Sequence, residues 1–264
     1  MRKFPRCSAH GVLTLTLLSR VAVAQTNTAP ASAANMPVQP AQIEVQLAKD
    51  ENILRDWANL GRYHRDNSLL PDPKETESRV VFMGDSITDA WGRSRGVFFP
   101  GKPYLNRGIS GQTTPQMLIR FRPDVIALKP KVVVILAGTN DLAGNTGPES
   151  LEDIEGNLQS MAELAKVNGI KVVLSSVMPV SDYTKPQTPK HPPEKILALN
   201  AWIKSYCAAN HLTYLDYYPA LIDDQKMFRK ELTFDGLHPN DAGYSVMSPL
   251  AAQAIAAALS AGNQ

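Results

Sequence analysis

The stretch that decides the fold is RVVFMGDSIT, residues 79–88, in which a short apolar run stops at Gly84-Asp85-Ser86. A β-branched, apolar run that ends in glycine is typical of a buried parallel strand that leads into a tight turn. Open α/β sheets bind ligands just beyond such strand ends. The pattern therefore places Ser86 where a nucleophile could sit, although a serine after a strand also commonly caps the next helix.

The rest of the chain alternates predicted strands with predicted helices. The strands are expected at residues 79–83, 103–106, 132–137, 171–177 and 213–216. The helices are expected at residues 114–128, 150–168, 193–210 and 241–259. This alternation predicts a parallel sheet that helices cover on both faces. With right-handed crossovers it becomes a doubly wound, flavodoxin-like α/β sheet of about five strands.

An acid and a base lie three residues apart in the segment DGLHP, residues 235–239, near the C-terminus. In a turn that contains Gly and Pro, a carboxylate can hold one imidazole nitrogen while the other nitrogen faces a serine hydroxyl. Asp235 and His238 are therefore the predicted orienting acid and general base of a serine hydrolase.

Two further loops contain candidate hydrogen-bond donors for an oxyanion. The segment GTND, residues 138–141, follows a predicted strand, so Asn140 would project its side-chain amide from the same sheet edge as Ser86. The segment NRGISGQTT, residues 106–114, follows another short strand. A glycine in that loop leaves its backbone N–H unshielded and lets an ester approach closely, which makes Gly111 the predicted donor there.

Turns rich in Gly, Asn and Asp are also common without any catalytic role, so the order and combination of these segments carry the argument. With all four segments present, the chain resembles the SGNH hydrolases, also called the GDSL family of lipases and esterases, over roughly residues 78–259. Residues 87–91 and 108–114 look most like the branch that includes bacterial lysophospholipase-like esterases and the platelet-activating-factor acetylhydrolase subunits.

The resemblance implies a three-layer α/β/α fold and a definite set of site residues. It implies a serine nucleophile at Ser86 and a base at His238 that Asp235 supports. It also implies an oxyanion hole made by the backbone N–H groups of Ser86 and Gly111 and by the side chain of Asn140. We therefore expect a serine esterase that acts by acyl transfer.

No cofactor and no metal ion are expected. The first predicted strand is not followed by a G-x-G-x-x-G or G-x-x-x-x-G-K-[ST] loop, which argues against nucleotide binding. The histidines are scattered without paired ligand spacing, which argues against a metal hydrolase. Asp85 lacks the second aspartate expected after the nucleophile of a haloacid-dehalogenase-type phosphatase, so we expect Asp85 to support the turn by hydrogen bonding.

The predicted substrate is an ester with a short acyl chain, such as acetyl. Polar, Gly and Pro residues dominate the loops at 94–96, 138–147 and 181–190, which does not suit a long apolar acyl channel. The pattern leaves open lysophospholipid or thioester substrates and an acyltransferase that moves acetyl groups between glycans. It also leaves open a non-catalytic carbohydrate- or lipid-binding module that has kept the fold.

Aromatic residues in the expected site loops point toward a sugar-containing substrate. The loop at 88–101 carries Trp91, Phe98 and Phe99, and a later loop carries Tyr183. Aromatic faces beside polar groups suit a glycan ester. The same residues could equally pack the loops, so both interpretations stay open at this point.

The N-terminus has the features of a secretory signal peptide: basic residues, an apolar stretch at 11–18 and Ala22-Val23-Ala24 before Gln25. We expect cleavage near Ala24 and export to the periplasm or the medium. Removal of residues 1–24 takes away four basic and no acidic residues, which changes the formal charge from +2 to −2. No electrostatic case for a nucleic-acid partner remains, and no uninterrupted apolar run reaches the roughly 20 residues of a membrane anchor.

Residues 25–42 are rich in Ala, Pro, Ser, Thr and Asn, which predicts a flexible linker. Residues 43–63 have apolar spacing compatible with a helix that packs against the hydrolase domain, which is expected to span residues 43–264. Once Cys7 is removed, Cys207 has no internal partner, so we expect no disulfide and an inert packing role for this thiol.

Overall fold

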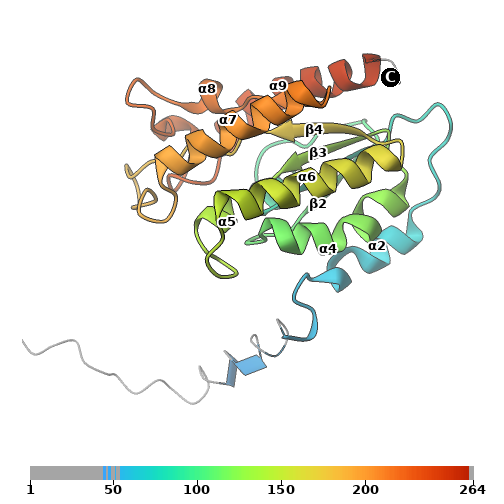
Figure 1. Cartoon of the computed structure of the whole chain (residues 1–264), viewed down its shortest axis with the longest axis horizontal. Helices are drawn as coiled ribbons and strands as arrows, with labels where there is room; N and C mark the ends of the chain where they lie inside the picture. Colours follow the sequence, from blue (N-terminus) through green and yellow to red (C-terminus); the bar gives the residue numbers. More distant parts are fainter. Residues whose placement is uncertain (1–43, 46, 49–50, 52–53, 262–264) are drawn as a thin grey trace, which may run out of the picture. The chain divides into compact units, whose positions relative to one another are not determined.

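The computed structural model describes residues 44–45, 47–48, 51 and 54–261. The expected signal peptide, its cleavage site near Ala24 and the expected linker lie outside the described residues. The strands are β1 (Val80–Gly84), β2 (Tyr104–Gly108), β3 (Val132–Leu136), β4 (Lys171–Ser175) and β5 (Thr213–Leu215) (Figure 1). The longer helices are α4 (Thr114–Asp124), α6 (Leu151–Val167), α7 (Pro193–Ala209) and α9 (Asp241–Ser260). The short helices are η1 (Leu60–Tyr63), α2 (His64–Leu69), α3 (Ser86–Ala90), η2 (Ile126–Leu128), α5 (Thr139–Leu142), α8 (Tyr218–Leu221) and η3 (Lys230–Leu232).

In the described part of the chain, the strands form one parallel sheet in the order β2-β1-β3-β4-β5. This is the expected doubly wound, flavodoxin-like order, in which the chain reverses direction across the sheet between β1 and β3. Gly84, at the end of β1, is in register with Gly108 of β2 and Leu136 of β3. The loops that follow these three strands therefore start side by side at one edge of the sheet.

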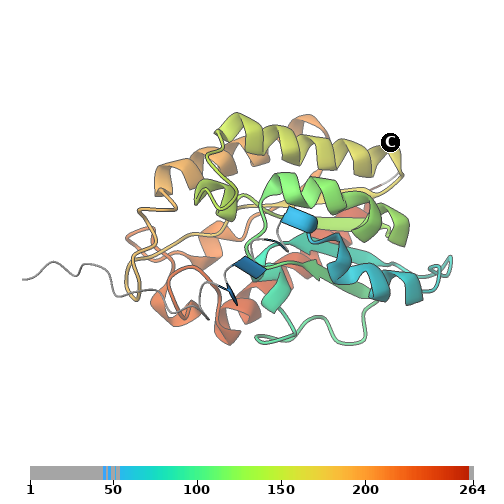
Figure 2. The ribbon, with the colours of Figure 1, turned by 90° about the horizontal axis from the view of Figure 1, so that it is seen from below.

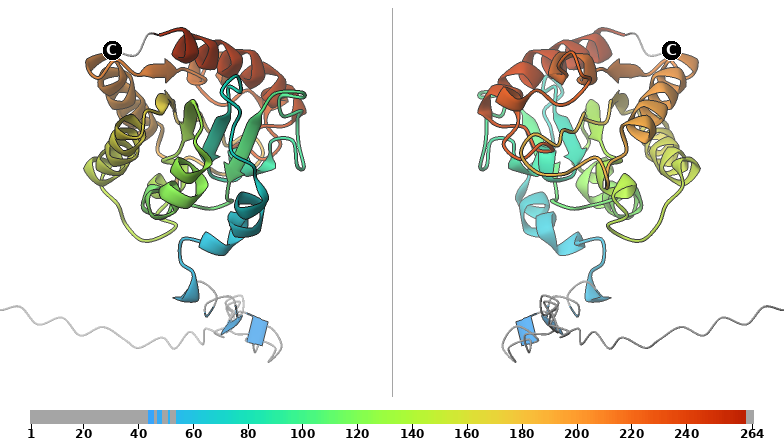
Figure 3. Two further views of the ribbon diagram at one scale, coloured as in Figure 1. Left: turned by 90° about the vertical axis from the view of Figure 1, so that its right-hand side faces the viewer. Right: turned by 90° about the vertical axis from the view of Figure 1, so that its left-hand side faces the viewer.

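Helices cover both faces of the sheet, because side chains alternate between the two faces along each strand. Val81 and Met83 of β1 belong to a buried cluster with residues of α4, α6 and α7. Val80 and Phe82 belong to a second buried cluster with residues of α3 and α9. Figures 2 and 3 show the sheet between these two layers of helices, which confirms the three-layer α/β/α fold.

Helix α9 is long and apolar enough, by length and composition alone, to cross a membrane. Its Tyr244, Met247, Ala251 and Ile255 are buried in the cluster that covers the sheet. This packing accounts for the apolar composition of α9 as that of a core helix.

The structure differs from the expected helix over residues 43–63. The described residues up to Arg55 in this stretch are helical, but Asp56 ends the helix and its carboxylate accepts the N–H groups of Leu60 and Gly61. Leu54 is 85% exposed, so the expected packing of this apolar residue on the domain is wrong. Instead, Tyr63 at the end of η1 is fully buried, and its hydroxyl donates to the carbonyl of Gly108.

The structure agrees with the packing role expected for Cys207. The thiol lies on α7 in the buried cluster beneath the sheet. Burial raises the pKa of Cys207 to about 12, so the thiol stays protonated and unreactive at neutral pH.

Candidate active site

Ser86 is the first residue of α3, directly after β1 and Asp85. Asp85 occupies the N-cap position, and its Oδ1 accepts the backbone N–H of Ile87 at 2.9 Å. The capping role considered for Ser86 therefore belongs to Asp85, and the Ser86 hydroxyl is available for another partner. A side chain at Gly84 would collide with Thr88 in α3 and with the carbonyl of Leu136, so only glycine permits this tight turn.

A continuous chain of hydrogen bonds runs from Ser86 through His238 to Asp235. Ser86 Oγ lies 2.9 Å from His238 Nε2, and His238 Nδ1 lies 2.8 Å from Asp235 Oδ2. With the Nδ1 proton held by the carboxylate, Nε2 is left as an acceptor for the serine hydroxyl. The structure thus brings together residues that are 152 positions apart in the sequence.

The turn that carries Asp235 and His238 is held by its own backbone. Asp235 Oδ1 accepts the N–H groups of Leu237 and His238 at 3.0 and 2.8 Å. Burial alone would raise the pKa of Asp235, but the hydrogen bonds from the His238 backbone, the His238 ring and Leu237 outweigh it and lower that pKa. The carboxylate therefore stays ionised at neutral pH, where it can stabilise a protonated His238.

Phe234, which sequence reasoning missed, lies against His238. The Phe234 ring stacks on the imidazole, with centroids 5.6 Å apart and planes inclined by 20°. The guanidinium of Arg95 lies 4.0 Å from the centre of the Phe234 ring. Arg95 comes from the loop after α3, and no local pattern in the sequence links it to Phe234.

Gly111 lies in the loop between β2 and α4, with φ at +81°, a backbone conformation that favours glycine. None of the described residues offers an acceptor to the backbone N–H of Gly111. The same holds for the N–H of Ser86, which stands at the first position of a helix, where no intrahelical acceptor exists. Ile109 N–H donates to the carbonyl of Gly84 at 3.0 Å, which joins the loop of Gly111 to the strand before Ser86.

Asn140 lies in α5 directly after β3 and is 7% exposed. Its Oδ1 accepts Asn145 Nδ2 at 2.9 Å, which orients the amide. Its Nδ2 donates to the carbonyl of Gln112 at 3.0 Å and lies 3.4 Å from Asp85 Oδ2. The amide therefore links the loop of Gly111 to Asp85, the residue before Ser86.

The contribution of Asp85 to stability should depend on pH. Burial raises the pKa of this fully buried carboxyl from 3.8 to about 7, against the hydrogen bond from Ile87 N–H. Because the folded state holds the proton of this carboxyl more tightly than the unfolded state does, protonated Asp85 stabilises the fold in full below pH 3.8. This stabilisation is lost as the pH rises through about 7. Asp85→Asn cannot ionise, so its unfolding free energy should rise relative to wild type between pH 5 and pH 8. Urea unfolding at both values checks this, and an unchanged difference would contradict it.

The aromatic residues expected to line the site are mostly packing residues. Trp91 is 2% exposed, and its ring packs against Phe82, Phe98 and Phe99 above the sheet. The loop-packing interpretation is therefore correct for this group. Tyr183 is exposed, and its hydroxyl donates to Asp223 Oδ2 at 2.6 Å.

A cavity of about 500 Å³ opens beside the loop of Gly111. It is lined by residues 55–57, Asn59, residues 109–112 and Gln116. Most of these side chains are polar, and Trp57 supplies an aromatic ring. In the part of the chain that the structure describes, no cluster of three or more His, Cys, Asp or Glu side chains could hold a metal ion.

Residues 82–246 match the model of the GDSL-like Lipase/Acylhydrolase family. An acetylxylan esterase of Xylanibacter ruminicola is 27% identical over 222 residues, which cover 70% of this chain but only 45% of that protein. Platelet-activating factor acetylhydrolase IB subunit alpha1 of Bos taurus is 27% identical over 199 residues, 72% of this chain and 78% of its own length.

Solved structures give the same result for the fold. A GDSL-like lipase from Bacteroides thetaiotaomicron is 47% identical, with a TM-score of 0.72, over 76% of this chain and 98% of its own. A catalytic mutant of the acetylxylan esterase Axe2 from Geobacillus stearothermophilus is 22% identical, with a TM-score of 0.56, over 71% of this chain and 96% of its own; at this identity the likeness concerns the fold alone. The chain therefore belongs to the GDSL-like lipase/acylhydrolase family of ester-hydrolysing enzymes.

Proposed function

We propose that the protein is a serine esterase that hydrolyses carboxylic esters through an acyl-enzyme on Ser86. The observation that carries this proposal is the chain of hydrogen bonds from Ser86 Oγ to His238 and on to Asp235, at 2.9 and 2.8 Å. A hydroxyl is a weak nucleophile until a positioned base takes its proton, and this arrangement supplies the base and the group that orients it.

The reaction follows from these contacts in two halves. His238 Nε2 takes the Ser86 proton as Oγ attacks the ester carbonyl, and the carbonyl oxygen becomes an oxyanion. The N–H groups of Ser86 and Gly111 and the amide of Asn140 would hold this oxyanion. His238 then gives its proton to the departing alcohol, which leaves an acyl-enzyme. Water, activated by the same imidazole, attacks that ester, and the carboxylic acid is released as Ser86 regains its proton.

Acetyl esters of carbohydrates are the proposed substrates. Two relatives of this chain, an acetylxylan esterase and a platelet-activating factor acetylhydrolase, carry acetyl chemistry in their names. The cavity beside Gly111 is lined mostly by polar side chains together with Trp57, which suits a hydroxylated alcohol more than a lipid chain. The proposal therefore joins a short acyl group to a sugar-like alcohol.

The enzyme should prefer acetyl to butyryl esters over chains of eight or more carbons. Each buried CH₂ contributes up to about 0.8 kcal/mol, so a long-chain lipase needs a long apolar channel to gain this energy. Values of kcat/KM for p-nitrophenyl acetate, butyrate, octanoate and palmitate, at matched solubility, check the preference. A specificity constant that climbs steadily to octanoate or beyond would show that the acyl site is long and apolar.

The alcohol part of the substrate needs a separate assay. Acetylated xylo-oligosaccharides should release acetate, and the products should be the same with and without an added acceptor sugar. Transfer of acetyl groups to the acceptor would instead identify a glycan acyltransferase, which uses the same catalytic residues.

A further inference from the structure

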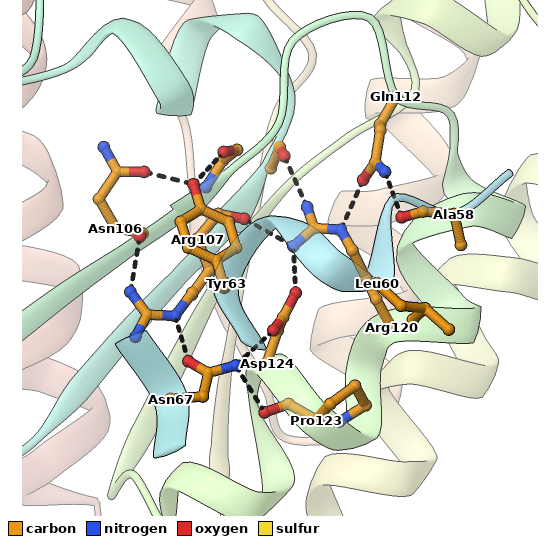
Figure 4. Close-up of polar contacts among 12 residues, drawn as sticks. Ala58, Leu60, Tyr63, Asn67, Asn106, Arg107, Gln112, Arg120, Pro123 and Asp124 are labelled. Carbon is orange, nitrogen blue, oxygen red and sulfur yellow. Dashed lines mark hydrogen bonds and ion pairs between the residues drawn. The ribbon is translucent and has the colours of Figure 1, made fainter. Parts of the chain in front are cut away.

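Arg120, on the inner side of α4, is completely buried, with 0% of its surface exposed. Its Nη2 donates to the carbonyl of Gly84 at 3.0 Å. Its Nη1 donates to the carbonyl of Arg107 at 2.8 Å and to Asp124 Oδ2 at 3.1 Å. Its Nε donates to Gln112 Oε1, so one guanidinium has four partners in a dry environment (Figure 4).

The partners of Arg120 stand next to the backbone donors of the site. The carbonyl of Gly84 is two residues before Ser86 and closes the strand that leads to it. Arg107 and Gln112 stand on either side of the short loop that carries Gly111. The Arg120 guanidinium therefore contacts the end of the strand that leads to Ser86 and both ends of the loop that carries Gly111.

Gln112 extends this network to the third donor and to the N-terminal segment. Its backbone carbonyl accepts Asn140 Nδ2 at 3.0 Å. Its side-chain Nε2 donates to the carbonyl of Ala58 at 2.7 Å (Figure 4). Gln112 therefore links Arg120 to Asn140: its side chain accepts from Arg120, and its backbone carbonyl accepts from the Asn140 amide.

We infer that Arg120 is a positioning residue, which sets the distances among the Ser86 N–H, the Gly111 N–H and the Asn140 amide. The guanidinium is planar and rigid, so its donors fix the directions of several acceptors at once, which a flexible ammonium cannot do. An oxyanion hole works only while its donors are held in place, and a displacement of about 1 Å can cost about 10²-fold in rate. This inference rests on the proposed acyl transfer at Ser86.

Arg79 offers a matched control at the other end of β1. It is also buried, and it donates to the carbonyls of Leu128 and Pro71 and to Glu77, each at 2.9 Å. Arg79 and Arg120 therefore do similar structural work, but only Arg120 contacts the loops of the site. Loss of either guanidinium should lower the stability of the fold, whereas only the loss of the Arg120 guanidinium should lower kcat.

The test compares Arg120→Lys with Arg79→Lys in the full chain, with p-nitrophenyl acetate as substrate. Arg120→Lys should lower kcat by about 10²-fold and change KM by less than about threefold, because misplaced donors affect the transition state. Affinity for an alkylboronic acid, which forms a tetrahedral anion on serine, should fall by a similar factor. Arg79→Lys should keep kcat within about twofold at 25 °C, even if its melting temperature drops equally.

Two variants at Gln112 keep the inference testable if Arg120→Lys does not fold. Gln112→Leu and Gln112→Glu both remove the donor to Ala58, but only Glu keeps an acceptor for Arg120 Nε. Gln112→Leu should lower kcat by about tenfold, and Gln112→Glu should recover most of that loss.

Three results would overturn the inference: full kcat in folded Arg120→Lys, an equal loss of kcat in Arg79→Lys, or equal kcat values for the two Gln112 variants. A failure of the proposed acyl transfer would look different. It would leave Ser86→Ala active, whatever the substitutions at Arg120 or Gln112 do.

Discussion

Replacement of Ser86 by Ala is expected to lower kcat by on the order of 10³-fold or more and to leave the fold intact. The hydroxyl is 2.9 Å from His238 Nε2, and none of the described contacts of His238 Nε2 offers a second nucleophile. Removal of the hydroxyl leaves only the general-base and oxyanion contributions, which act on water far less effectively. Steady-state rates with p-nitrophenyl acetate measure the loss.

Ser160 provides the control for this substitution. It lies on α6, where its hydroxyl donates to the carbonyl of Gly156, so Ser160→Ala should keep full activity. A serine-directed phosphonate should add its mass to the wild-type peptide that contains Ser86 and leave Ser86→Ala unmodified. Near-normal turnover by correctly folded Ser86→Ala would end the serine-esterase proposal.

Replacement of Asn140 by Ala should cost about 10² to 10³ in kcat, through the loss of one oxyanion donor. The amide is oriented by Asn145 and lies between Gln112 and Asp85, so a cavity rather than another donor would replace it. KM should change little, because the interaction strengthens only as charge develops on the carbonyl oxygen.

Asn200 is a matched control for Asn140. Both asparagines are 7% exposed, and Asn200 holds the backbone N–H and carbonyl of Val177 at 2.7 and 3.0 Å. Asn200→Ala should therefore destabilise the fold, because it leaves two buried backbone groups without their hydrogen-bond partner, but it should keep kcat within about threefold. If Asn140→Ala raises KM and leaves kcat unchanged, Asn140 is a ground-state binding residue instead.

The expected strands agree with the structure because their signal is local. The run at 132–137 corresponds to β3 at Val132–Leu136, and the stretch at 79–83 corresponds to β1 at Val80–Gly84. Short runs of β-branched and apolar residues that end at glycine or a turn are typical of strands buried on both faces of a parallel sheet, so local composition, length and flanking residues indicate them. The Asp235–His238 turn is local in the same sense, since both residues lie within one turn of chain.

The expectations that differ from the structure are those that depended on partners. Apolar spacing over residues 43–63 is compatible with a helix, but spacing does not show whether another element packs against Leu54. In the structure the Leu54 side chain is exposed. Trp91 looked equally suited to a sugar site and to packing. Its environment is set by Phe82, Phe98 and Phe99, so only the folded sheet could decide between the two.

The sequence by itself determined the order of strands and helices and the residue types in each loop at the strand ends. These follow from hydrophobic periodicity and turn chemistry, which act between neighbours along the chain. Only the tertiary structure decided that Phe234 stacks on His238, that Arg95 lies over the Phe234 ring, and that Arg120 holds the strand end before Ser86 to the loop of Gly111. Such contacts join segments that are distant in the sequence. The acceptors of the buried Arg120 guanidinium come together only when the folded strands bring their carbonyl groups to one edge of the sheet.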